Sequence, residues 1–263
     1  MLFFKRKRKK IGLALGGGAA RGIAHVGVLK AFQKHHIPIH YIAGTSSGSI
    51  VGGLFSAGMD VDRMVNELPK LRWRDFAGVH LSRKGMVSSK PLESVIQRYV
   101  GQKKMRDLVI PFSPLATNVV TGDGEALNDP DLDLHRAIRA SASFPGVYAP
   151  CEINGQYYFD GGASANIPSQ IVRDMGADIV ISVDVIPHMV LNHMPRHLAI
   201  LADRGLDLIL HGVSEKMCEE SDFVLKPITE YIHSFQVKKG PQLVEMGMAC
   251  VENNLETIKR IVS

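Results

Sequence analysis

The residues best suited to covalent chemistry lie in one short string, Gly44-Thr45-Ser46-Ser47-Gly48. An apolar run over residues 37–43 precedes this string, and small and apolar residues over 47–57 follow it. A serine between a strand and a helix is held on a tight turn that exposes its hydroxyl group, and glycines flank it because larger side chains would strike the neighbouring backbone. The amino terminus of the following helix also favours a developing negative charge. The string therefore predicts that Ser46 is a nucleophile, with a serine- and glycine-rich helix cap as the alternative interpretation.

A glycine-rich turn, Gly16-Gly17-Gly18-Ala19-Ala20-Arg21-Gly22, is the second candidate. Backbone N–H groups in such a turn can point into a common hollow that holds a phosphate or an oxyanion. A dinucleotide site would need the pattern GxGxxG and an acidic residue about 20 residues later. Ala19 replaces the central glycine of that pattern, and the first acidic residue after the turn is Asp60. The turn therefore favours an oxyanion or anion site over a dinucleotide site, and the absence of Gly-Lys-Ser/Thr excludes a Walker loop.

The third candidate is Asp160-Gly161-Gly162, which follows a short aromatic run over residues 157–159. Asp-Gly pairs are common in turns, so this string alone predicts no more than a turn. A nucleophilic serine needs a base, however, and none of the eleven histidines has a setting that marks it as that base. His25 lies in an apolar helical stretch and is expected in the core. The histidines at 188, 193 and 197 have a spacing that fits no metal site.

The elements that must position these residues alternate between short strand-like runs and longer helical runs. This alternation favours an α/β fold with a mostly parallel sheet and helices on its faces. Strands are expected at residues 11–15, 37–43, 111–120, 157–159 and 178–186. Helices are expected at residues 22–34, 47–57, 61–71, 91–100, 132–142, 198–217 and 243–261. No repeat or linker divides the chain, so we expect one domain over 11–263 after a basic tail over 1–10.

Composition and charge exclude several classes of protein. The chain has 263 residues, 45% hydrophobic and 22% charged, which is typical of a globular domain and not of a disordered chain, a coiled coil or a collagen-like fibre. The net charge is +5, but residues 5–10 carry six positive charges, so the rest of the chain is at −1. A nucleic-acid partner is therefore not expected, because it would need a basic face on the folded body.

The three cysteines, which form no CxxC pair, favour a reducing compartment, and we expect a cytoplasmic protein. No run of 18 apolar residues is present that would predict a transmembrane helix. The tail combines Phe3 and Phe4 with six positive charges, which predicts peripheral attachment to an anionic membrane surface. The alternative is a solvated tail that only aids solubility. The sequence carries no signal for an oligomeric state.

Three motifs, in this order, make the chain resemble the patatin-like phospholipase family. They are residues 15–29, the string at 44–48 and Asp160-Gly-Gly162. Weaker matches lie at 116–117, 121–122 and 139–146. The resemblance covers most of the chain, and it implies a three-layer α/β/α fold related to, but distinct from, the α/β hydrolases. It also implies a lipid acyl hydrolase that uses a Ser-Asp dyad, no catalytic histidine, and no metal or cofactor.

The resemblance implies a role for each matching residue. Ser46 would be the nucleophile and Asp160 its base, while Arg21 would brace the glycine-rich turn. The backbone amides of the turn would form the oxyanion hole, at Gly17, Gly18 and Ala19. Glycines around these groups would support them, at Gly22, Gly44, Gly48, Gly161 and Gly162. Ala19 departs from the usual glycine, but an amide donor there requires glycine only if its φ is positive.

Two alternatives to a hydrolase stay open at this point. An acyltransferase would use the same dyad with an alcohol in place of water. A binding protein would use the glycine-rich turn to hold an anion or a nucleotide without catalysis.

Overall fold

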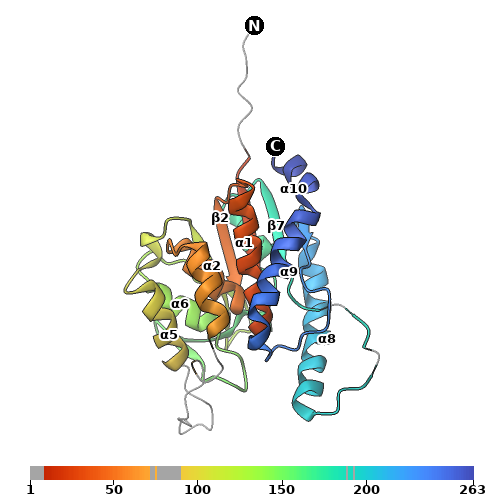
Figure 1. The fold of residues 1–263 in the computed structure, drawn as a ribbon. Coiled ribbons are helices and arrows are strands. Elements are labelled where there is room, and N and C mark those ends of the chain that lie inside the picture. Colours follow the sequence, from red (N-terminus) through yellow and green to blue (C-terminus); the bar gives the residue numbers. More distant parts are fainter. Residues whose placement is uncertain (1–8, 72–74, 76–89, 188, 192) are drawn as a thin grey trace.

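A mixed sheet runs through the centre of the molecule (Figure 1). The computed structural model describes residues 9–71, 75, 90–187, 189–191 and 193–263. Within these residues the strands are β1 (Ile11–Leu15), β2 (Tyr41–Thr45), β3 (Phe112–Asn118), β4 (Gly124–Ala126), β5 (Cys151–Ile153), β6 (Gln156–Asp160), β7 (Ile179–Val183) and β8 (Phe223–Leu225). Their order is β5-β6-β3-β2-β1-β7-β8, and β4 pairs with β3.

Strands β3, β2, β1, β7 and β8 are parallel, whereas β4, β5 and β6 are antiparallel to their neighbours. In this register Leu15 of β1 lies opposite Gly44 of β2, and Thr45 lies opposite Leu115 of β3. The next residue of β3, Ala116, pairs with Asp160 at the end of β6. Because neighbouring strands are about 4.8 Å apart, this register brings the three sequence motifs to one edge of the sheet.

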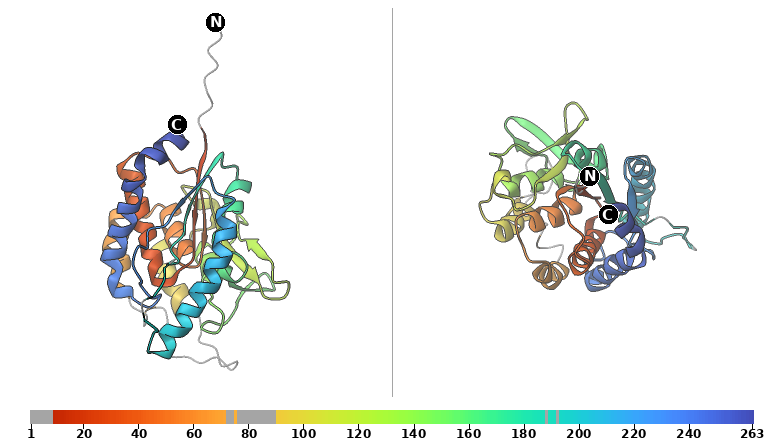
Figure 2. Two further views of the ribbon diagram at one scale, coloured as in Figure 1. Left: turned by 90° about the vertical axis from the view of Figure 1, so that its right-hand side faces the viewer. Right: turned by 90° about the horizontal axis from the view of Figure 1, so that it is seen from above.

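Helices cover both faces of the sheet. They are α1 (Ala24–Lys34), α2 (Ser47–Ser56), α3 (Val61–Glu67), α5 (Lys90–Val100), α6 (Leu134–Ser141), α7 (Ser169–Asp174), α8 (Leu198–Cys218), α9 (Gly240–Asn253) and α10 (Leu255–Val262). Short 3-10 turns lie at Ala19–Ile23, Leu68–Lys70, Met105–Asp107, Gly161–Ala163 and Val237–Lys239. In Figure 2, α1 and α9 lie on one side of the sheet and α8 on the other.

The side chains of β1 show how the two faces are packed. Leu13 and Leu15 are buried in the larger core, with α1 and α2, whereas Ala14 belongs to the smaller cluster under α7. Gly12 also faces α7, where an added Cβ would come 2.0 Å from Val172 Cγ1. The three-layer α/β/α arrangement with a mostly parallel sheet is therefore as predicted.

Several predicted boundaries are wrong in instructive ways. The strand expected at 37–43 is β2, which begins four residues later and ends two residues later, because Ile37 packs into the core from a loop. The helix expected at 243–261 is interrupted at Asn254, between α9 and α10. Strands β4, β5 and β8 and helix α7 were not expected. Most of the stretch between the helices expected at 61–71 and 91–100 lies outside the described residues.

The chain enters the sheet through Lys10. Its N–H donates to Asp178 Oδ2 at 2.7 Å, and its carbonyl accepts from the N–H groups of Asp178 and Ile179. Residues 1–8 of the predicted tail lie outside the described residues, and the domain boundary at residue 11 stays a prediction. In the described part of the chain no helix is long and apolar enough to cross a membrane.

Candidate functional site

Ser46 lies on a sharp turn between β2 and α2. Its φ is +53° and its ψ is −119°, a conformation that costs a non-glycine residue about 1–3 kcal/mol. Two contacts hold this turn. The Ser46 N–H donates to Ser141 Oγ at 3.1 Å, and its carbonyl accepts from the Ser49 N–H at 2.9 Å. These contacts hold the backbone of Ser46 at the amino terminus of α2, where the residue is half-buried.

The glycines of the Ser46 string are required by close backbone packing. A Cβ on Gly44 would come 2.6 Å from the carbonyl carbon of Gly48. A Cβ on Gly48 would come 2.1 Å from the Leu15 carbonyl oxygen. Neither backbone neighbour can move aside, so both glycines let α2 start directly against the ends of β1 and β2.

Asp160 is buried at the end of β6, with 3% of its surface exposed. Its Oδ1 accepts the Gly162 N–H at 2.8 Å, and Oδ2 has no hydrogen-bond partner among the described residues. Burial raises the pKa of Asp160 to about 6, while the neighbouring Ser46 hydroxyl and the Gly162 N–H act in the opposite direction. A carboxylate with a pKa near neutral beside a hydroxyl group has the properties of a general base.

The weaker sequence matches hold these two residues in place. Ser141 supplies the Oγ that accepts the Ser46 N–H, and the Ser143 carbonyl accepts the Asp160 N–H at 2.9 Å. On the other side, Thr117 Oγ1 donates to the Asp160 carbonyl at 3.0 Å. The stretch 139–146 therefore acts as a bridge that sets the position of Ser46 relative to Asp160.

The glycine-rich turn passes directly beside Ser46. A Cβ on Gly17 would come 3.2 Å from the Ser46 Cβ. Asn166 makes two hydrogen bonds to Gly17. Its backbone carbonyl accepts the Gly17 N–H at 3.2 Å, and its side-chain Nδ2 donates to the Gly17 carbonyl at 3.4 Å. The Gly17 amide is thus occupied, in contrast to its predicted role as an oxyanion donor. The amides of Gly18 and Ala19 donate to no acceptor among the described residues.

Ala19 meets the condition under which glycine would be preferred, because its φ is +51°. The left-handed conformation costs an alanine about 1–2 kcal/mol. Gly22 follows in the same turn, where an added Cβ would come 2.3 Å from Ser47 Oγ. The turn is therefore strained at Ala19 and packed without space against the start of α2.

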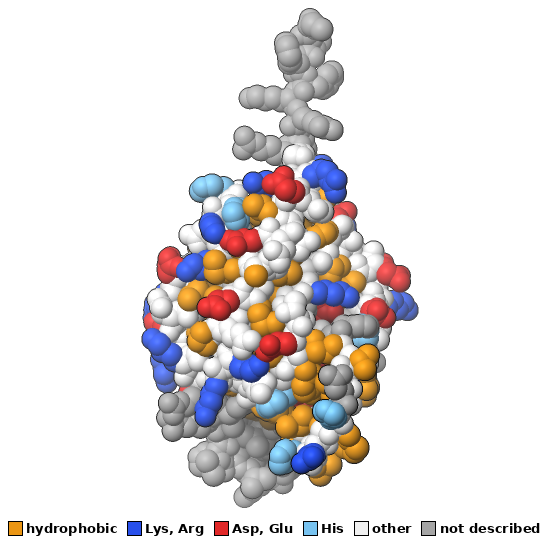
Figure 3. Space-filling view, turned by 45° about the vertical axis from the view of Figure 1, so that its right-hand side comes forward, with side chains coloured by type: hydrophobic (Ala, Val, Ile, Leu, Met, Phe, Trp, Pro, Cys, Tyr) orange, Lys and Arg blue, Asp and Glu red, His pale blue; other side chains and the backbone are white. Residues whose placement is uncertain are grey.

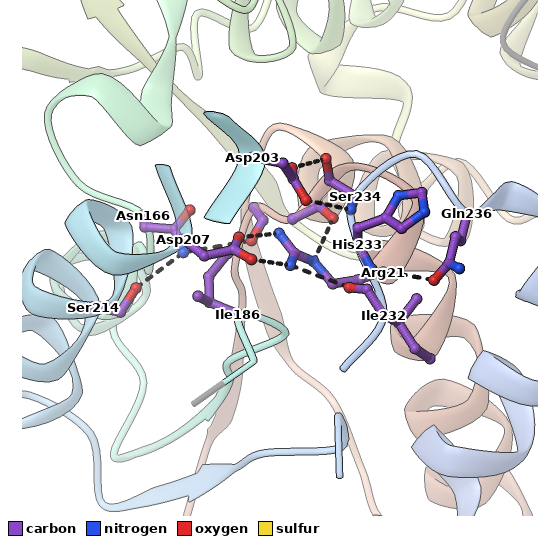
Figure 4. Close-up of polar contacts among 12 residues, drawn as sticks. Arg21, Asn166, Ile186, Asp203, Asp207, Ser214, Ile232, His233, Ser234 and Gln236 are labelled. Atoms are coloured by element: carbon purple, nitrogen blue, oxygen red, sulfur yellow. Dashed lines mark hydrogen bonds and ion pairs between the residues drawn. The ribbon is translucent and has the colours of Figure 1, made fainter. Parts of the chain in front are cut away.

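Arg21 anchors the turn to α8 (Figure 4). Its guanidinium group is buried and makes two bonds to Asp207, 2.8 Å to Oδ2 and 2.6 Å to Oδ1. Its Nε donates to the Gly18 carbonyl at 3.2 Å, and Nη1 donates to the Ile232 carbonyl at 3.4 Å. Burial raises the pKa of Asp207, and the Arg21 guanidinium opposes that shift. Arg21 thus contacts the turn at the Gly18 carbonyl, and its bracing role stays a prediction.

The partners of the turn on α8 and near α7 were not found by sequence reasoning. Asn166 Nδ2 donates to Ser214 Oγ at 3.0 Å, and Asp203 Oδ2 accepts the Ser234 N–H at 3.0 Å. Asp203, Asp207 and Ser214 are the buried residues of α8. Their spacing of four and seven residues places them on one face of the helix, but it does not identify the glycine-rich turn as their partner.

His25 is a core residue, as expected, and its surroundings do not suit a base. It is fully buried, and its Nε2 lies 2.8 Å from the Gly16 carbonyl. Burial lowers its pKa to about 4, which keeps the ring neutral at pH 7. Among the described residues no histidine hydrogen-bonds Ser46, and no cluster of three metal-binding side chains is found.

The Arg21–Asp207 pair offers a test of how the turn is held. We expect Asp207→Ala to lower the free energy of unfolding by about 3–5 kcal/mol, because it leaves a buried guanidinium unpaired. Replacing both partners, with Arg21→Met and Asp207→Leu, should recover most of that loss but not the orientation of Gly18. Urea unfolding checks the first expectation, with Glu67→Ala in the exposed Arg63–Glu67 pair as the control that should change little. An Asp207→Ala variant as stable as the parent would show that the pair does not stabilise the folded protein.

A family model described as patatin-like phospholipase matches residues 13–173 of the chain. An uncharacterized NTE family protein of Mycobacterium tuberculosis is 33% identical over 179 residues, which cover 67% of this chain and 49% of that protein. Lysophospholipase NTE1 of Debaryomyces hansenii is 31% identical over 189 residues, 67% of this chain and 12% of that protein. The chain thus spans about half the length of the mycobacterial relative and far less of the yeast enzyme.

Two solved structures share the fold. VipD from Legionella pneumophila superposes with a TM-score of 0.55 at 14% identity, over 95% of this chain and 67% of that chain. The type III effector protein ExoU has a TM-score of 0.54 at 14% identity, over 95% of this chain and 53% of that chain. At this identity the likeness concerns the fold alone.

Proposed function

Because the chain belongs to the patatin-like phospholipase family, we propose that it is a serine-dependent lipid acyl hydrolase. The observation that carries the proposal is the buried Asp160 carboxylate, whose Oδ2 has no hydrogen-bond partner among the described residues and whose pKa burial raises to about 6 beside Ser46. A buried acid that is neither ion-paired nor bound to a metal weakens the folded state, and such groups gather where a protein needs a base. The dyad is therefore Ser46 as nucleophile and Asp160 as base.

Acylation begins when Ser46 Oγ attacks the carbonyl carbon of the ester and its proton passes to Asp160. The carbonyl oxygen becomes an oxyanion, for which the amides of Gly18 and Ala19 are the donors, and the amino terminus of α2 adds a favourable field. The C–O bond to the leaving alcohol then breaks, and that alcohol takes the proton from Asp160. The product is an acyl ester on Ser46.

Deacylation repeats these steps with water. Asp160 accepts a proton from the water molecule as its oxygen attacks the acyl carbonyl, and the same amides stabilise the second oxyanion. Collapse of that intermediate releases the fatty acid, and the proton returns to Ser46 Oγ. The arrangement needs no histidine, because a single carboxylate takes and returns the proton in both halves.

Lysophospholipids are the first substrates to test, because relatives of this chain bear the name lysophospholipase. The deciding experiment measures fatty acid release from a panel of lysophospholipids, phospholipids and short-chain esters, with labelling by a fluorophosphonate alongside. Labelling of Ser46 together with release of fatty acid supports the proposal. A folded protein that neither labels nor releases fatty acid would instead be a binding protein.

The basic tail provides a separate prediction about membranes. Removing residues 1–8 takes away Phe3, Phe4 and four positive charges. We expect weaker binding to anionic vesicles at low salt, because each charge near an anionic leaflet contributes about 1 kcal/mol. Turnover of a soluble short-chain ester should not change. Co-sedimentation with vesicles measures the effect. Equal binding of the full-length and shortened chains at low salt would show that the tail only aids solubility.

A further inference from the structure

Helix α8 is built with its polar side inward. A helix on the surface of a globular protein normally turns its apolar stripe toward the core. In α8 the buried residues are Asp203, Asp207 and Ser214, whereas Leu198 is 82% exposed and Ile209 is 68% exposed. The apolar side chains in the first half of the helix therefore face away from the sheet, whereas Met217 near its end packs against the smaller core cluster. The buried Asp207 holds the glycine-rich turn through Arg21. The exposed apolar stripe on the opposite side of the helix, at Leu198 and Ile209, has no partner among the described residues.

The exposed stripe continues into the segment before the helix. We call this surface the apolar face, and it consists of Val190, Met194, Leu198, Leu201, Leu208 and Ile209. Figure 3 shows hydrophobic side chains gathered at the lower right of the molecule, with histidine and basic side chains beside them. The Arg204 guanidinium, which donates to the Met189 carbonyl at 2.8 Å, ties the segment to the helix. Contiguous apolar surface of this kind marks a site of interaction with a protein or a membrane.

The charges around the apolar face favour an anionic partner. Residues 185–202 contain no aspartate or glutamate, and they include Arg196, which is exposed. The acidic side chains that follow are buried and hydrogen-bonded: Asp203 accepts from the Ser234 N–H, and Asp207 accepts from Arg21. The outward surface of this half of α8 is thus apolar with basic and neutral groups only. An apolar surface that carries an exposed arginine and no exposed acidic side chain over residues 185–209 is suited to contact an anionic bilayer.

The apolar face is attached to the candidate site and not to the tail. Asp203 accepts the Ser234 N–H, and the Ser234 carbonyl accepts the Ala20 N–H at 3.1 Å, so the first turns of α8 lie beside the glycine-rich turn. Lys10 lies at the other end of β1, six residues or about 20 Å from the start of that turn at Gly16. In Figure 1 the coloured ribbon starts at the top, at the beginning of β1, whereas α8 begins at the bottom. A membrane against the apolar face would meet the end of the molecule that carries Ser46.

We propose that the apolar face docks on an anionic lipid membrane and brings Ser46 to the lipid that it cleaves. This inference rests on the proposed function, since it assigns the surface from which the acyl substrate is taken. The apolar side chains would enter the interface, and Arg196 would contact the anionic headgroups. Docking of this kind should persist in high salt, in contrast to attachment by the basic tail, because apolar burial is not screened.

The test uses the full-length chain carrying Ser46→Ala, so that the vesicles stay intact. Leu198→Asp with Ile209→Asp should weaken binding to vesicles of phosphatidylcholine and phosphatidylglycerol about a hundredfold, at low and at high salt. Val109→Asp with Val120→Asp is the matched control, because both valines are exposed on other parts of the surface. The control should bind as the parent does. Circular dichroism and urea unfolding establish that each variant is folded.

Three outcomes separate the possibilities. Equal vesicle binding by the Leu198/Ile209 variant and its parent overturns the proposal. A parent that dimerises in sedimentation velocity, with a monomeric variant that still binds vesicles, also overturns it and makes the face a contact between two copies of the chain. With Ser46 restored, the face variant should hydrolyse a soluble short-chain ester as fast as the wild type. If the wild type itself hydrolyses no ester, the proposed function fails while the vesicle result still decides the docking surface.

Discussion

Replacing Ser46 with alanine is expected to lower kcat for ester hydrolysis by roughly 10⁴- to 10⁶-fold and to abolish fluorophosphonate labelling. The hydroxyl oxygen is the atom that forms the acyl bond in the proposed mechanism, so no neighbouring group can replace it. The turn should survive, because its hydrogen bonds to Ser141 and Ser49 use the backbone of residue 46. The free energy of unfolding should therefore change little.

Ser47→Ala is the matched control for that experiment. Ser47 is the adjacent serine of the same string, and its Oγ is buried without a hydrogen-bond partner among the described residues. The variant should keep both labelling and hydrolysis, because this hydroxyl has no role in the proposed mechanism. Mass spectrometry of the labelled protein identifies the modified serine. A Ser46→Ala protein that still labels at Ser47 or Ser49 would show that the nucleophile is assigned wrongly.

The local motifs could be predicted because residues that are adjacent in the sequence determine their geometry. Strand β1 was predicted to the residue, since a compact apolar run ends at three glycines. The Ser46 turn needs only a strand before it, a helix after it and glycines between, all of which lie within about ten residues. Strand β2 was misplaced, because Ile37 and Ile39 are apolar without being in the sheet and Gly44 continues the strand.

The residues that hold the glycine-rich turn could not be predicted in the same way. Arg21 pairs with Asp207 across 186 residues, and Asn166 reaches Gly17 across 149 residues. These contacts depend on how α7 and α8 pack on the sheet, which no local pattern specifies. The apolar repeat of α8 predicts a helix correctly, but its first half, at Leu198, Leu201 and Ile209, is exposed, because the contact with Arg21 requires Asp207 to face inward.

The backbone conformation of Ala19 also could not be predicted from the neighbouring residues in the sequence. Its positive φ occurs between Gly18, where an added Cβ would come 2.6 Å from Val185 Cγ2, and Arg21, which is anchored to α8. Three consecutive glycines predict an unusual turn, yet they do not predict that the next residue also has a positive φ. The site thus combines a motif that sequence reveals with a set of supports that only the fold assembles.

Asp160→Asn is expected to reduce kcat/KM by a factor of roughly 10² to 10⁴, because an amide cannot accept the Ser46 proton. The shape of the site should be kept, since the amide oxygen of the new side chain can still accept the Gly162 N–H that Asp160 Oδ1 accepts at 2.8 Å. In the wild type, activity should rise with pH around a midpoint near 6, as the buried carboxyl becomes ionised. A comparable loss from any single His→Ala variant would contradict the dyad.

The same substitution should make the protein more stable at neutral pH. The pKa of Asp160 is raised in the folded state from 3.8 to about 6, so the folded protein binds its proton more tightly than the unfolded chain does. The resulting stability is fully present below pH 3.8 and is lost as the pH rises through about 6. Asparagine stays neutral and avoids that loss, which corresponds to about 1–3 kcal/mol.

Urea unfolding of both proteins across this pH range measures the difference. Asp160→Asn should exceed the wild type by about 1–3 kcal/mol at pH 7, and the two should converge as the pH falls below 3.8, where the wild-type carboxyl is protonated in both states. Asp123→Asn, at an exposed carboxylate, is the control and should change neither stability nor activity. A loss of activity with no gain in stability at pH 7 would mean that the buried carboxylate is well compensated in the folded state. A gain in stability together with the loss of activity would support the view that the fold holds an unfavourable buried charge beside Ser46 in order to use it as a base.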